Sequence, residues 1–216
     1  MAKNKKRVKS EAAKKAAEKA RKKRVLLKNI KFFAIFMAIA IAIVAIIVVV
    51  GNLPEKKGAP VPTEHAAIAV EGYGTLHVEL YGNEAPETVK AFKELAHAGK
   101  YNGITIDKLL NGMLETTAIS STSKIKGEFS GNVKHTKGVL SMVLPDGNDS
   151  ANGEFFIVTQ TLKDLDGKSC AFGKITDMDV LNRILKDLEK IELDENGNIP
   201  ADKQIKITSV SLHDHH

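Results

Sequence analysis

One stretch of the sequence, residues 135–157, combines two strand-like runs with a polar loop that can present side chains for binding. Residues 138–143 predict a strand, and the Pro, Asp, Gly, Asn and Ser residues that follow predict a turn-rich loop. A second apolar strand is predicted at 155–158. Strands that lead into and out of a polar loop can hold side chains at the mouth of a barrel or a sheet. We expect this stretch to place Phe156 at the floor of a pocket.

Other side chains with reactive groups are poorer candidates for a site. The tail His213-Asp214-His215-His216 carries imidazole and carboxylate groups that can bind a metal, but we favour a frayed terminus. His135 lies beside a predicted strand and is expected to be structural. Cys170 lies in an apolar run, so we expect its thiol to be buried and inert. The sequence shows no Ser-His-Asp order, no glycine-rich phosphate loop and no CxxC motif, and we expect no cofactor and no metal.

The charge of the chain is segregated. The formal net charge is +6, but residues 1–31 carry 14 Lys and Arg against 2 Glu. The remaining residues carry 18 Lys and Arg against 24 Asp and Glu, so a basic arm precedes a mildly acidic domain. Aromatic residues make up 5% of the chain and Trp is absent, which predicts a core of aliphatic side chains. The single cysteine excludes an intrachain disulfide.

The basic arm at 1–31 is rich in Lys, Ala and Glu. Glu11 and Glu18 each precede a lysine by four residues, which predicts a solvated, partly formed helix. Such an arm can bind nucleic acid or anionic lipid, and it can equally be the positive cytoplasmic flank of a membrane span. We favour the flank, because an apolar span follows at once, and we do not expect nucleic acid as a partner.

Residues 32–50 read FFAIFMAIAIAIVAIIVVV and contain no charge, Pro or Gly. As a helix, this span would extend about 28 Å, close to the hydrocarbon thickness of a bilayer. A buried core helix would show a polar face, and a cleaved signal peptide would have a shorter apolar core and an Ala-x-Ala site. We therefore expect one uncleaved transmembrane helix in the cell membrane. The excess of Lys and Arg before it predicts a cytoplasmic N-terminus and an extracytoplasmic C-terminal domain.

Residues 51–64 hold three of the six prolines and predict an extended linker, and residues 65–216 form the soluble domain. The sequence pattern of this domain predicts strands at 66–70, 75–81, 104–110, 113–117 and 204–212, and helices at 83–98 and 179–188. Many short strands with two helices favour a mainly β domain, either closed into a barrel or sandwiched.

A series of short motifs runs in order from residue 66 to residue 212. The motifs are GTL at 74–76, VELY at 78–81, APETV at 85–89, YNG at 101–103, HTKGVLSM at 135–142, FFI at 155–157, LDGK at 165–168 and FGK at 172–174. In this order and at this spacing they resemble the cyclophilins, the β-barrel family of peptidyl-prolyl cis-trans isomerases. The resemblance implies a closed eight-stranded antiparallel barrel with two capping helices. It also implies a domain that binds proline-containing polypeptides, and we expect this domain to be monomeric.

The resemblance implies a catalytic role for Lys108. The family places an arginine in a Phe-His-Arg run, which here reads Ile106-Asp107-Lys108. Rotation about an X-Pro bond crosses a barrier of roughly 20 kcal/mol and leaves a lone pair on the proline nitrogen, which a hydrogen-bond donor stabilises. Lys108 keeps the positive charge but lacks the planar guanidinium fork. The alternatives are a strand lysine that points to water, or an ion pair with Glu115 that leaves the donor partly occupied.

The apolar part of the implied substrate-binding surface is largely kept. Met113 matches a flexible apolar wall, and Leu165 matches an apolar pocket residue. Phe156 matches the phenylalanine at the pocket floor, with plain core packing as the alternative. Val143 and Leu144 replace a small Ala-Asn pair, so the backbone contact to substrate is expected to survive there without the side-chain contact.

The polar part of the implied surface has changed at most positions. Gly112 removes an aromatic wall, and Glu115 replaces an amide with a charge. Glu154 stands where a glutamine normally meets the peptide backbone, while Asp164 and Ser169 stand where many members have Trp and His. Loss of one well-placed donor typically costs about a hundredfold in rate. We therefore expect a weak isomerase that acts on extracytoplasmic polypeptides, with a non-catalytic proline-peptide-binding or chaperone module as the alternative.

Overall fold

The computed structural model describes residues 37–38, 41–45, 58–119, 125–144, 149–150 and 153–213. The chain forms two compact units, Met1–Lys56 and Lys57–His216. In the first unit, residues 37–38 and 41–45 are helical, and no helix among the described residues is long and apolar enough to cross a membrane. The basic arm at 1–31, the rest of the predicted transmembrane helix at 32–50 and half of the linker at 51–64 lie outside the described residues.

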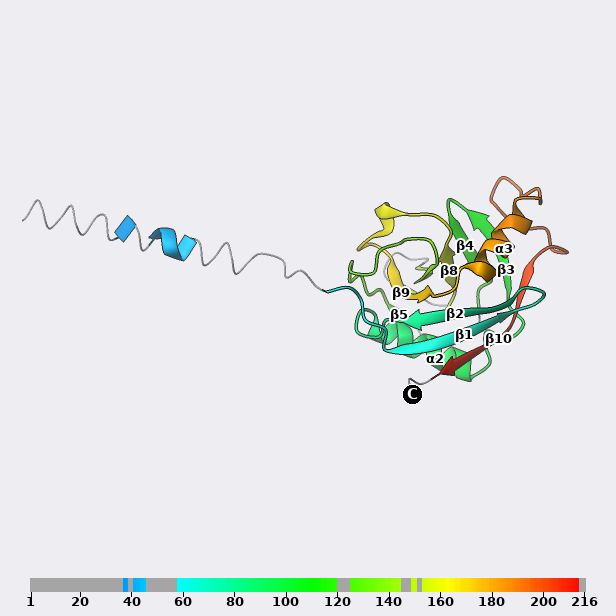
Figure 1. The fold of residues 1–216 in the computed structure, drawn as a ribbon, viewed down its shortest axis with the longest axis horizontal. Helices are drawn as coiled ribbons and strands as arrows, with labels where there is room; N and C mark the ends of the chain where they lie inside the picture. Colours follow the sequence, from blue (N-terminus) through cyan, green and yellow to red (C-terminus); the bar gives the residue numbers. More distant parts are fainter. Residues whose placement is uncertain are drawn as a thin grey trace, which may run out of the picture. The chain divides into compact units, whose positions relative to one another are not determined.

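The second unit is a mainly β domain (Figure 1). Its elements are β1 (Glu64–Val70), β2 (Gly74–Leu80), α2 (Pro86–His97), β3 (Thr105–Leu110), β4 (Met113–Thr116), β5 (Ile125–Lys126), β6 (Val139–Met142), β7 (Asp149–Ser150), β8 (Phe155–Val158), the 3-10 helix η1 (Lys163–Leu165), β9 (Cys170–Ile175), α3 (Asp179–Leu188) and β10 (Ile205–His213). Each strand and helix that the sequence pattern predicts forms, with its ends shifted by at most three residues, while β5, β7, β9 and η1 were not predicted.

Eight of these strands close into one barrel in the order β1-β10-β3-β4-β8-β6-β9-β2, and each neighbouring pair is antiparallel. Strands β5 and β7 pair separately as a two-stranded sheet. Because the barrel is closed, the described strands leave no open edge between its first and last members. Closure confirms the barrel over the sandwich.

The two-residue period of the strands divides their side chains between the inside and the outside of the barrel. Along β8, Phe155 and Ile157 belong to the main core, while Phe156 and Val158 belong to a second, smaller apolar cluster. The main core contains side chains from all eight barrel strands and from both helices. The second cluster is therefore carried on the outer side of the barrel wall.

Aromatic rings meet at the centre of the main core. Phe92 lies with its ring centroid 5.1 Å from that of Tyr101 and 5.2 Å from that of Phe172, and Phe155 packs edge-on against Tyr101 at 5.6 Å. Most other core residues are aliphatic, as the composition predicts. The expectation of an aliphatic core was therefore incomplete. The sequence has only eight phenylalanines, but a few aromatic rings are large enough to fill the middle of a small barrel.

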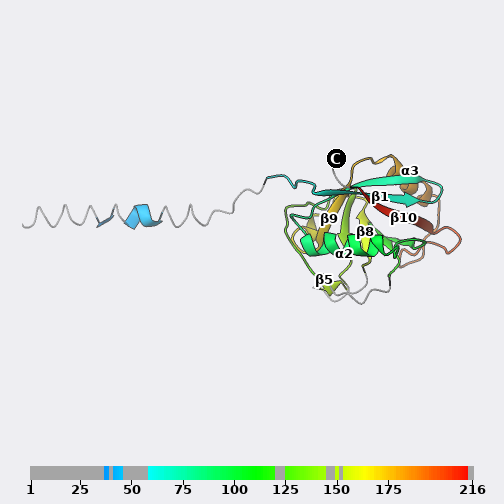
Figure 2. The same ribbon diagram turned by 90° about the horizontal axis from the view of Figure 1, so that it is seen from below.

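Helices α2 and α3 lie on opposite sides of the barrel, as Figures 1 and 2 show. The buried face of α3 consists of Val180, Leu181, Ile184 and Leu188, which recur at helical spacing and join the main core. Helix α2 begins with Pro86 in its first turn, where its missing N–H is no loss, and Gly99 follows its end at φ 66°.

A carboxylate from a distant segment caps α2. Glu128 accepts hydrogen bonds from the backbone N–H groups of Glu87 (3.1 Å) and Thr88 (2.9 Å), and from the Thr88 hydroxyl (2.8 Å). A negative charge at this end of a helix satisfies free N–H groups and complements the helix dipole. The Thr88 hydroxyl also lies 3.0 Å from the Cys170 sulfur at the start of β9. Cys170 is buried as expected, and burial raises the pKa of its thiol, which disfavours the reactive thiolate.

Candidate functional site

The second apolar cluster brings together side chains that are far apart in the sequence. Its buried members are Tyr81, Val133, Val139, Phe156, Val158 and Ala171, and the partly buried Met113, Val143, Leu162 and Leu165 pack against them. We call these ten residues the outer cluster. It contains all four apolar residues that the sequence assigned to substrate binding: Met113 on β4, Val143 directly after β6, Phe156 on β8 and Leu165 in η1.

The floor of the outer cluster is well covered. Phe156 is 5% exposed, while Met113, Val143 and Leu165 are each partly exposed. An apolar group that approaches this face therefore meets Met113, Val143 and Leu165 before it meets the Phe156 ring. Met113 has the most flexible of these side chains, so its thioether is the group that can move most readily to uncover the ring.

Lys108 and Glu115 form an ion pair beside the outer cluster. Lys108 lies opposite Glu115 across strands β3 and β4, and its Nζ is 3.3 Å from Glu115 Oε2. Ile106 lies opposite Thr116, so the pairing shifts between Ile106 and Lys108 and leaves Asp107 as an extra residue in β3. Of the alternatives to a catalytic role for Lys108, the ion pair with Glu115 is confirmed, so the lysine does not simply point to water. The side chains of Lys108 and Glu115 are 31% and 16% exposed, so the ion pair is only partly buried.

Glu154 lies just before β8, and its surroundings disfavour its charge. Its carbonyl oxygen accepts a hydrogen bond from the Val143 N–H at 2.9 Å, which occupies that backbone group. Burial raises the pKa of the Glu154 carboxyl, and the charges of Glu115 and Asp107 raise it further, while Lys108 lowers it. The ammonium of Lys108 is thus outweighed by three carboxylates, and this edge of the site is acidic.

Gly112 and Asn111 form the two-residue turn between β3 and β4, with φ of 82° and 52°. Two positive φ angles are what a tight hairpin of this length requires, and Asn-Gly is the pair best suited to it. A Cβ at Gly112 would lie 2.6 Å from Cγ of Gln160. The backbone therefore requires glycine here, and the aliphatic part of Gln160 occupies the space next to it. The sequence indicated the missing aromatic wall but not the side chain that takes its place.

Asp164 and Ser169, the other two changed positions, lie on either side of Leu165. Asp164 is exposed in η1. Ser169 is partly buried, and its backbone N–H donates to the Leu165 carbonyl at 3.0 Å. Its hydroxyl lies 3.0 Å from the hydroxyl of Ser141, which is fully buried on β6. Ser169 is thus tied both to the rim of the outer cluster and to a polar group beneath it.

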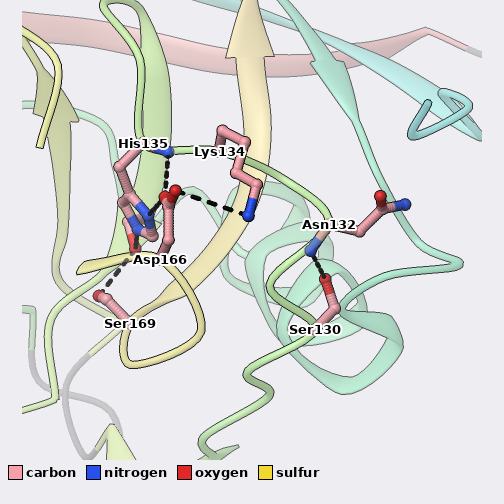
Figure 3. Close-up of polar contacts among 7 residues, drawn as sticks. Ser130, Asn132, Lys134, His135, Asp166 and Ser169 are labelled. Atoms are coloured by element: carbon pink, nitrogen blue, oxygen red, sulfur yellow. Dashed lines mark hydrogen bonds and ion pairs between the residues drawn. The ribbon is translucent and has the colours of Figure 1, made fainter. Parts of the chain in front are cut away.

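The group beneath Ser169 is a hydrogen-bonded chain that the sequence did not reveal. Asp166 Oδ1 accepts from the backbone N–H of His135 (2.8 Å) and lies 3.1 Å from its Nδ1. The other ring nitrogen, Nε2, lies 3.3 Å from the hydroxyl of Ser141. Figure 3 shows the Asp166 carboxylate between the His135 ring and the Lys134 ammonium, which is 3.6 Å away. The expected structural role of His135 is confirmed, since its side chain is 1% exposed.

The chain of Asp166, His135 and Ser141 has the members of a hydrolase triad, although in the sequence they do not occur in a familiar order. The sequence order of these three residues gave no sign of a triad, and the fold brings them together. Ser141 has 0% exposure, so its hydroxyl cannot reach a substrate, and the arrangement does not support nucleophilic catalysis. Burial lowers the pKa of His135, against the opposing effect of Asp166, so the ring is neutral at neutral pH.

Among the described residues, no group of three or more His, Cys, Asp or Glu side chains is arranged to hold a metal ion. Of the tail residues proposed as ligands, His213 ends β10, and Asp214, His215 and His216 lie outside the described part of the chain. The metal and frayed-terminus interpretations of the tail both stay predictions.

Comparison with protein families gives one match that spans the second unit. The model of the family "Cyclophilin type peptidyl-prolyl cis-trans isomerase/CLD" matches residues 65–212. A protein of Cryptococcus neoformans named peptidyl-prolyl cis-trans isomerase-like 2 is 30% identical over 159 residues, which cover 68% of this chain and 27% of that protein. The chain thus spans about a quarter of the length of this relative.

Shorter relatives are covered more fully. A Helicobacter pylori protein named peptidyl-prolyl cis-trans isomerase is 32% identical over 117 residues, which cover 50% of this chain and 72% of that protein. The solved structure of a Cryptosporidium parvum cyclophilin-type peptidyl-prolyl cis-trans isomerase, determined in the presence of the dipeptide Ala-Pro, superimposes with a TM-score of 0.59 at 23% identity. The match covers 70% of this chain and 99% of that one, which shows a shared fold.

Proposed function

Because the chain belongs to the cyclophilin-type peptidyl-prolyl cis-trans isomerase family, we propose that its C-terminal domain isomerises X-Pro bonds in polypeptides. The observation that supports this proposal best is the position of Met113, Phe156 and Leu165 in one outer cluster beside the Lys108–Glu115 pair. An apolar surface can hold the proline ring, and a cationic donor next to it can hydrogen-bond the proline nitrogen as the amide twists.

Lys108 is the proposed catalytic donor. An ammonium has three N–H groups, so Lys108 can keep one bond to Glu115 and offer another to the proline nitrogen. The ion pair restrains the ammonium and reduces its effective charge, and a lysine lacks the fixed fork of a guanidinium. These two effects, together with the covered floor at Phe156, are the reasons why we propose a weak isomerase.

The test of catalysis is the cis-trans exchange rate of a peptide such as Ac-Ala-Ala-Pro-Ala-NH2, measured by NMR with the unit Lys57–His216. We expect exchange faster than in the peptide alone, a loss of about tenfold or more with Lys108→Ala, and a gain with Glu115→Gln because it frees the ammonium. Lys206→Ala, an exposed lysine on β10, is the matched control and should leave the rate unchanged. Exchange at the uncatalysed rate would exclude isomerase activity.

A second candidate function is a non-catalytic module that binds proline-containing peptides, in the manner of a chaperone. The Lys108–Glu115 ion pair is the observation that favours it, because a donor held by its neighbour is less available to stabilise the twisted amide, while the apolar surface can still hold the proline ring. This function predicts that the peptide binds with the same affinity before and after Lys108→Ala, and that the exchange rate stays at the uncatalysed value. Absence of binding would exclude this candidate as well.

We propose further that the domain acts outside the cytoplasm, tethered by one membrane span. The support is in the sequence: 14 Lys and Arg at 1–31, then an uncharged span at 32–50, then a proline-rich linker. In intact cells that express the full chain, protease added outside should remove the domain and leave the N-terminal arm protected. Protection of the domain, or release of the full chain by carbonate washing, would contradict this topology.

A further inference from the structure

The hydrogen-bonded chain under the outer cluster has a fixed direction. Asp166 is ionised, because the pKa of its carboxyl lies below its usual range. Burial alone would raise this pKa, but the backbone N–H and the ring of His135, together with the Lys134 ammonium, lower it by more. An ionised carboxylate has no proton to donate. The proton in the 3.1 Å contact with His135 must therefore be carried by Nδ1.

The tautomer of His135 determines the next two hydrogen bonds. The ring is neutral and its proton is on Nδ1, so Nε2 has a free lone pair and accepts. The Ser141 hydroxyl, 3.3 Å away, must donate to it. Ser141 has then used its one proton, so in its 3.0 Å contact with Ser169 it is the acceptor, and Ser169 donates. Every hydroxyl proton in the chain points toward Asp166.

This direction leaves Ser169 with lone pairs as its remaining hydrogen-bonding capacity. Ser169 is partly exposed, whereas His135 and Ser141 are 1% and 0% exposed. Ser141 pairs with Phe156 on β8 and with Ala171 on β9, both members of the outer cluster, and Ser169 lies one residue before β9. The acceptor therefore lies at the margin of the surface that we propose for proline.

We propose that the Ser169 hydroxyl oxygen accepts a hydrogen bond from a backbone N–H that flanks the bound proline, and that His135 and Asp166 are positioning residues that keep Ser169 an acceptor. The inference rests on the proposed function and names a contact within it. Proline has no N–H of its own, so the peptide groups on either side of it supply the donors nearest to the ring. A fixed acceptor at the rim matches such a donor and rejects a carbonyl, which gives the site a preferred orientation of the peptide.

The experiment measures the affinity of the full-length chain for Ac-Ala-Ala-Pro-Ala-NH2 and for two analogues, each methylated on the amide nitrogen of the residue before or after proline. Methylation removes one N–H and leaves the carbonyls in place. We expect one of the two analogues to bind about three- to tenfold more weakly to the wild-type chain, the size of effect for one neutral hydrogen bond. With Ser169→Ala this difference should disappear.

Three further variants separate hydrogen bonding from a loss of structure. Ser169→Thr keeps the hydroxyl and should restore the difference between the peptides. Ser141→Ala keeps Ser169 but removes the group that fixes its proton, so the difference should shrink. Ser130→Ala is the matched control, because Ser130 bonds to the backbone of Asn132 and not to the chain of Asp166, His135 and Ser141 (Figure 3); it should behave as wild type.

Three results would overturn all or part of the inference, and they are distinguishable. If the parent peptide binds and methylation changes the affinity equally in the wild type and in Ser169→Ala, the Ser169 contact is refuted and the proposed function stands. If the parent peptide does not bind the wild-type chain, both the contact and the proline site are refuted. An unchanged difference in Ser141→Ala would refute the positioning role of His135 and Asp166.

Discussion

Phe155 and Phe156 are neighbours in the sequence and face opposite sides of the same barrel wall. Phe155 is fully buried among aromatic rings of the main core, with its centroid 5.6 Å from that of Tyr101 and 6.0 Å from that of Phe92. Phe156 belongs to the smaller outer cluster, whose rim is partly exposed and lies beside four charged side chains. The inner face is mostly apolar and stabilises the barrel, and its few buried hydroxyl groups are hydrogen-bonded. The outer face combines apolar side chains with the Lys108–Glu115 ion pair and with the Glu154 carboxyl, whose charge its surroundings disfavour.

The largest expected effect separates these two faces. Phe155→Ala should lower the free energy of unfolding by about 3–5 kcal/mol, because it leaves a cavity inside the closed barrel. Phe156→Ala, the matched change one residue away, should cost clearly less stability and should abolish binding of the proline peptide. Urea unfolding and peptide titration of both variants measure this contrast. Equal losses of stability would show that the outer cluster is simply a second core.

Removal of Asp166 should have the next largest effect. Asp166→Ala leaves the buried Nδ1–H and the backbone N–H of His135 without their acceptor, and we expect a loss of about 2–4 kcal/mol in the free energy of unfolding. Asp164→Ala, an exposed position two residues earlier, is the control and should change stability little. A small effect of Asp166→Ala would mean that the polar chain does not hold this loop in place.

The same polar chain makes the domain sensitive to acid. Burial lowers the pKa of His135 below 6.5, so the unfolded chain takes up a proton before the folded one does. The stability is therefore complete above about pH 6.5 and falls as the pH decreases toward the folded-state pKa of His135. Asp166, whose pKa is below 3.8, adds a further loss below pH 3.8. In His135→Gln, unfolding free energies measured from pH 7 to pH 5 should be lower throughout but flatter with pH, and an unchanged slope would contradict this assignment.

The turn between β3 and β4 should show a smaller effect. Gly112→Ala places a side chain at φ 82° and brings its Cβ close to Gln160, and we expect a cost of about 1–2 kcal/mol. Gln160→Ala should recover the steric part of this cost but not the part due to φ. Gly58→Ala, where no atom lies within 4 Å of the added Cβ, is the control for the substitution itself. Thermal unfolding of the single and double variants measures the coupling.

Glu154 should give the smallest change, and one of opposite sign. The pKa of the Glu154 carboxyl is raised above 4.5, so the folded domain binds this proton more tightly than the unfolded chain does. Proton binding therefore stabilises the fold at low pH, and this stabilisation is lost as the pH rises through the folded-state pKa. Glu154→Gln removes that loss and should stabilise the domain at pH 7 by less than about 1 kcal/mol, since the group is partly solvated. Glu94→Gln, at an exposed position on α2, should not stabilise. A loss of stability in Glu154→Gln would show that its charge is favourable where it is.

The sequence could predict features that depend on neighbouring residues, but not contacts between distant segments. Strands and helices form at the predicted places because alternation and helical spacing depend on neighbouring residues, as in β8 and α3. The apolar candidate residues were chosen because their types match a known order of motifs, and the structure brings them into one cluster. The contacts between Asp166, His135 and Ser141 join different strands and loops, and the bulge at Asp107 depends on how β3 pairs with β4. Such features arise from closure of the barrel and have no local pattern.

The replacement of the aromatic wall illustrates the same limit. The sequence shows that Gly112 lacks a ring, and Asn111-Gly112 between two predicted strands is a hairpin signal that we did not use, but the nearby Gln160 becomes evident only from the fold. The acidic edge around Lys108 is similar, since Asp107, Glu115 and Glu154 are read as separate substitutions until the barrel places β3, β4 and β8 side by side. The identity of these residues was known from the sequence, but their effect on one another becomes evident only from the structure.

The most direct test of the account is an NMR titration of the unit Lys57–His216 with Ac-Ala-Ala-Pro-Ala-NH2, followed through backbone amides and the methyl group of Met113. We predict that the changes gather at Met113, Val143, Phe156 and Leu165 on the outer face, while the amides of Phe92 and Tyr101 in the main core stay unchanged. Changes on another face of the barrel, or none at saturating peptide, would contradict a proline site on the outer cluster.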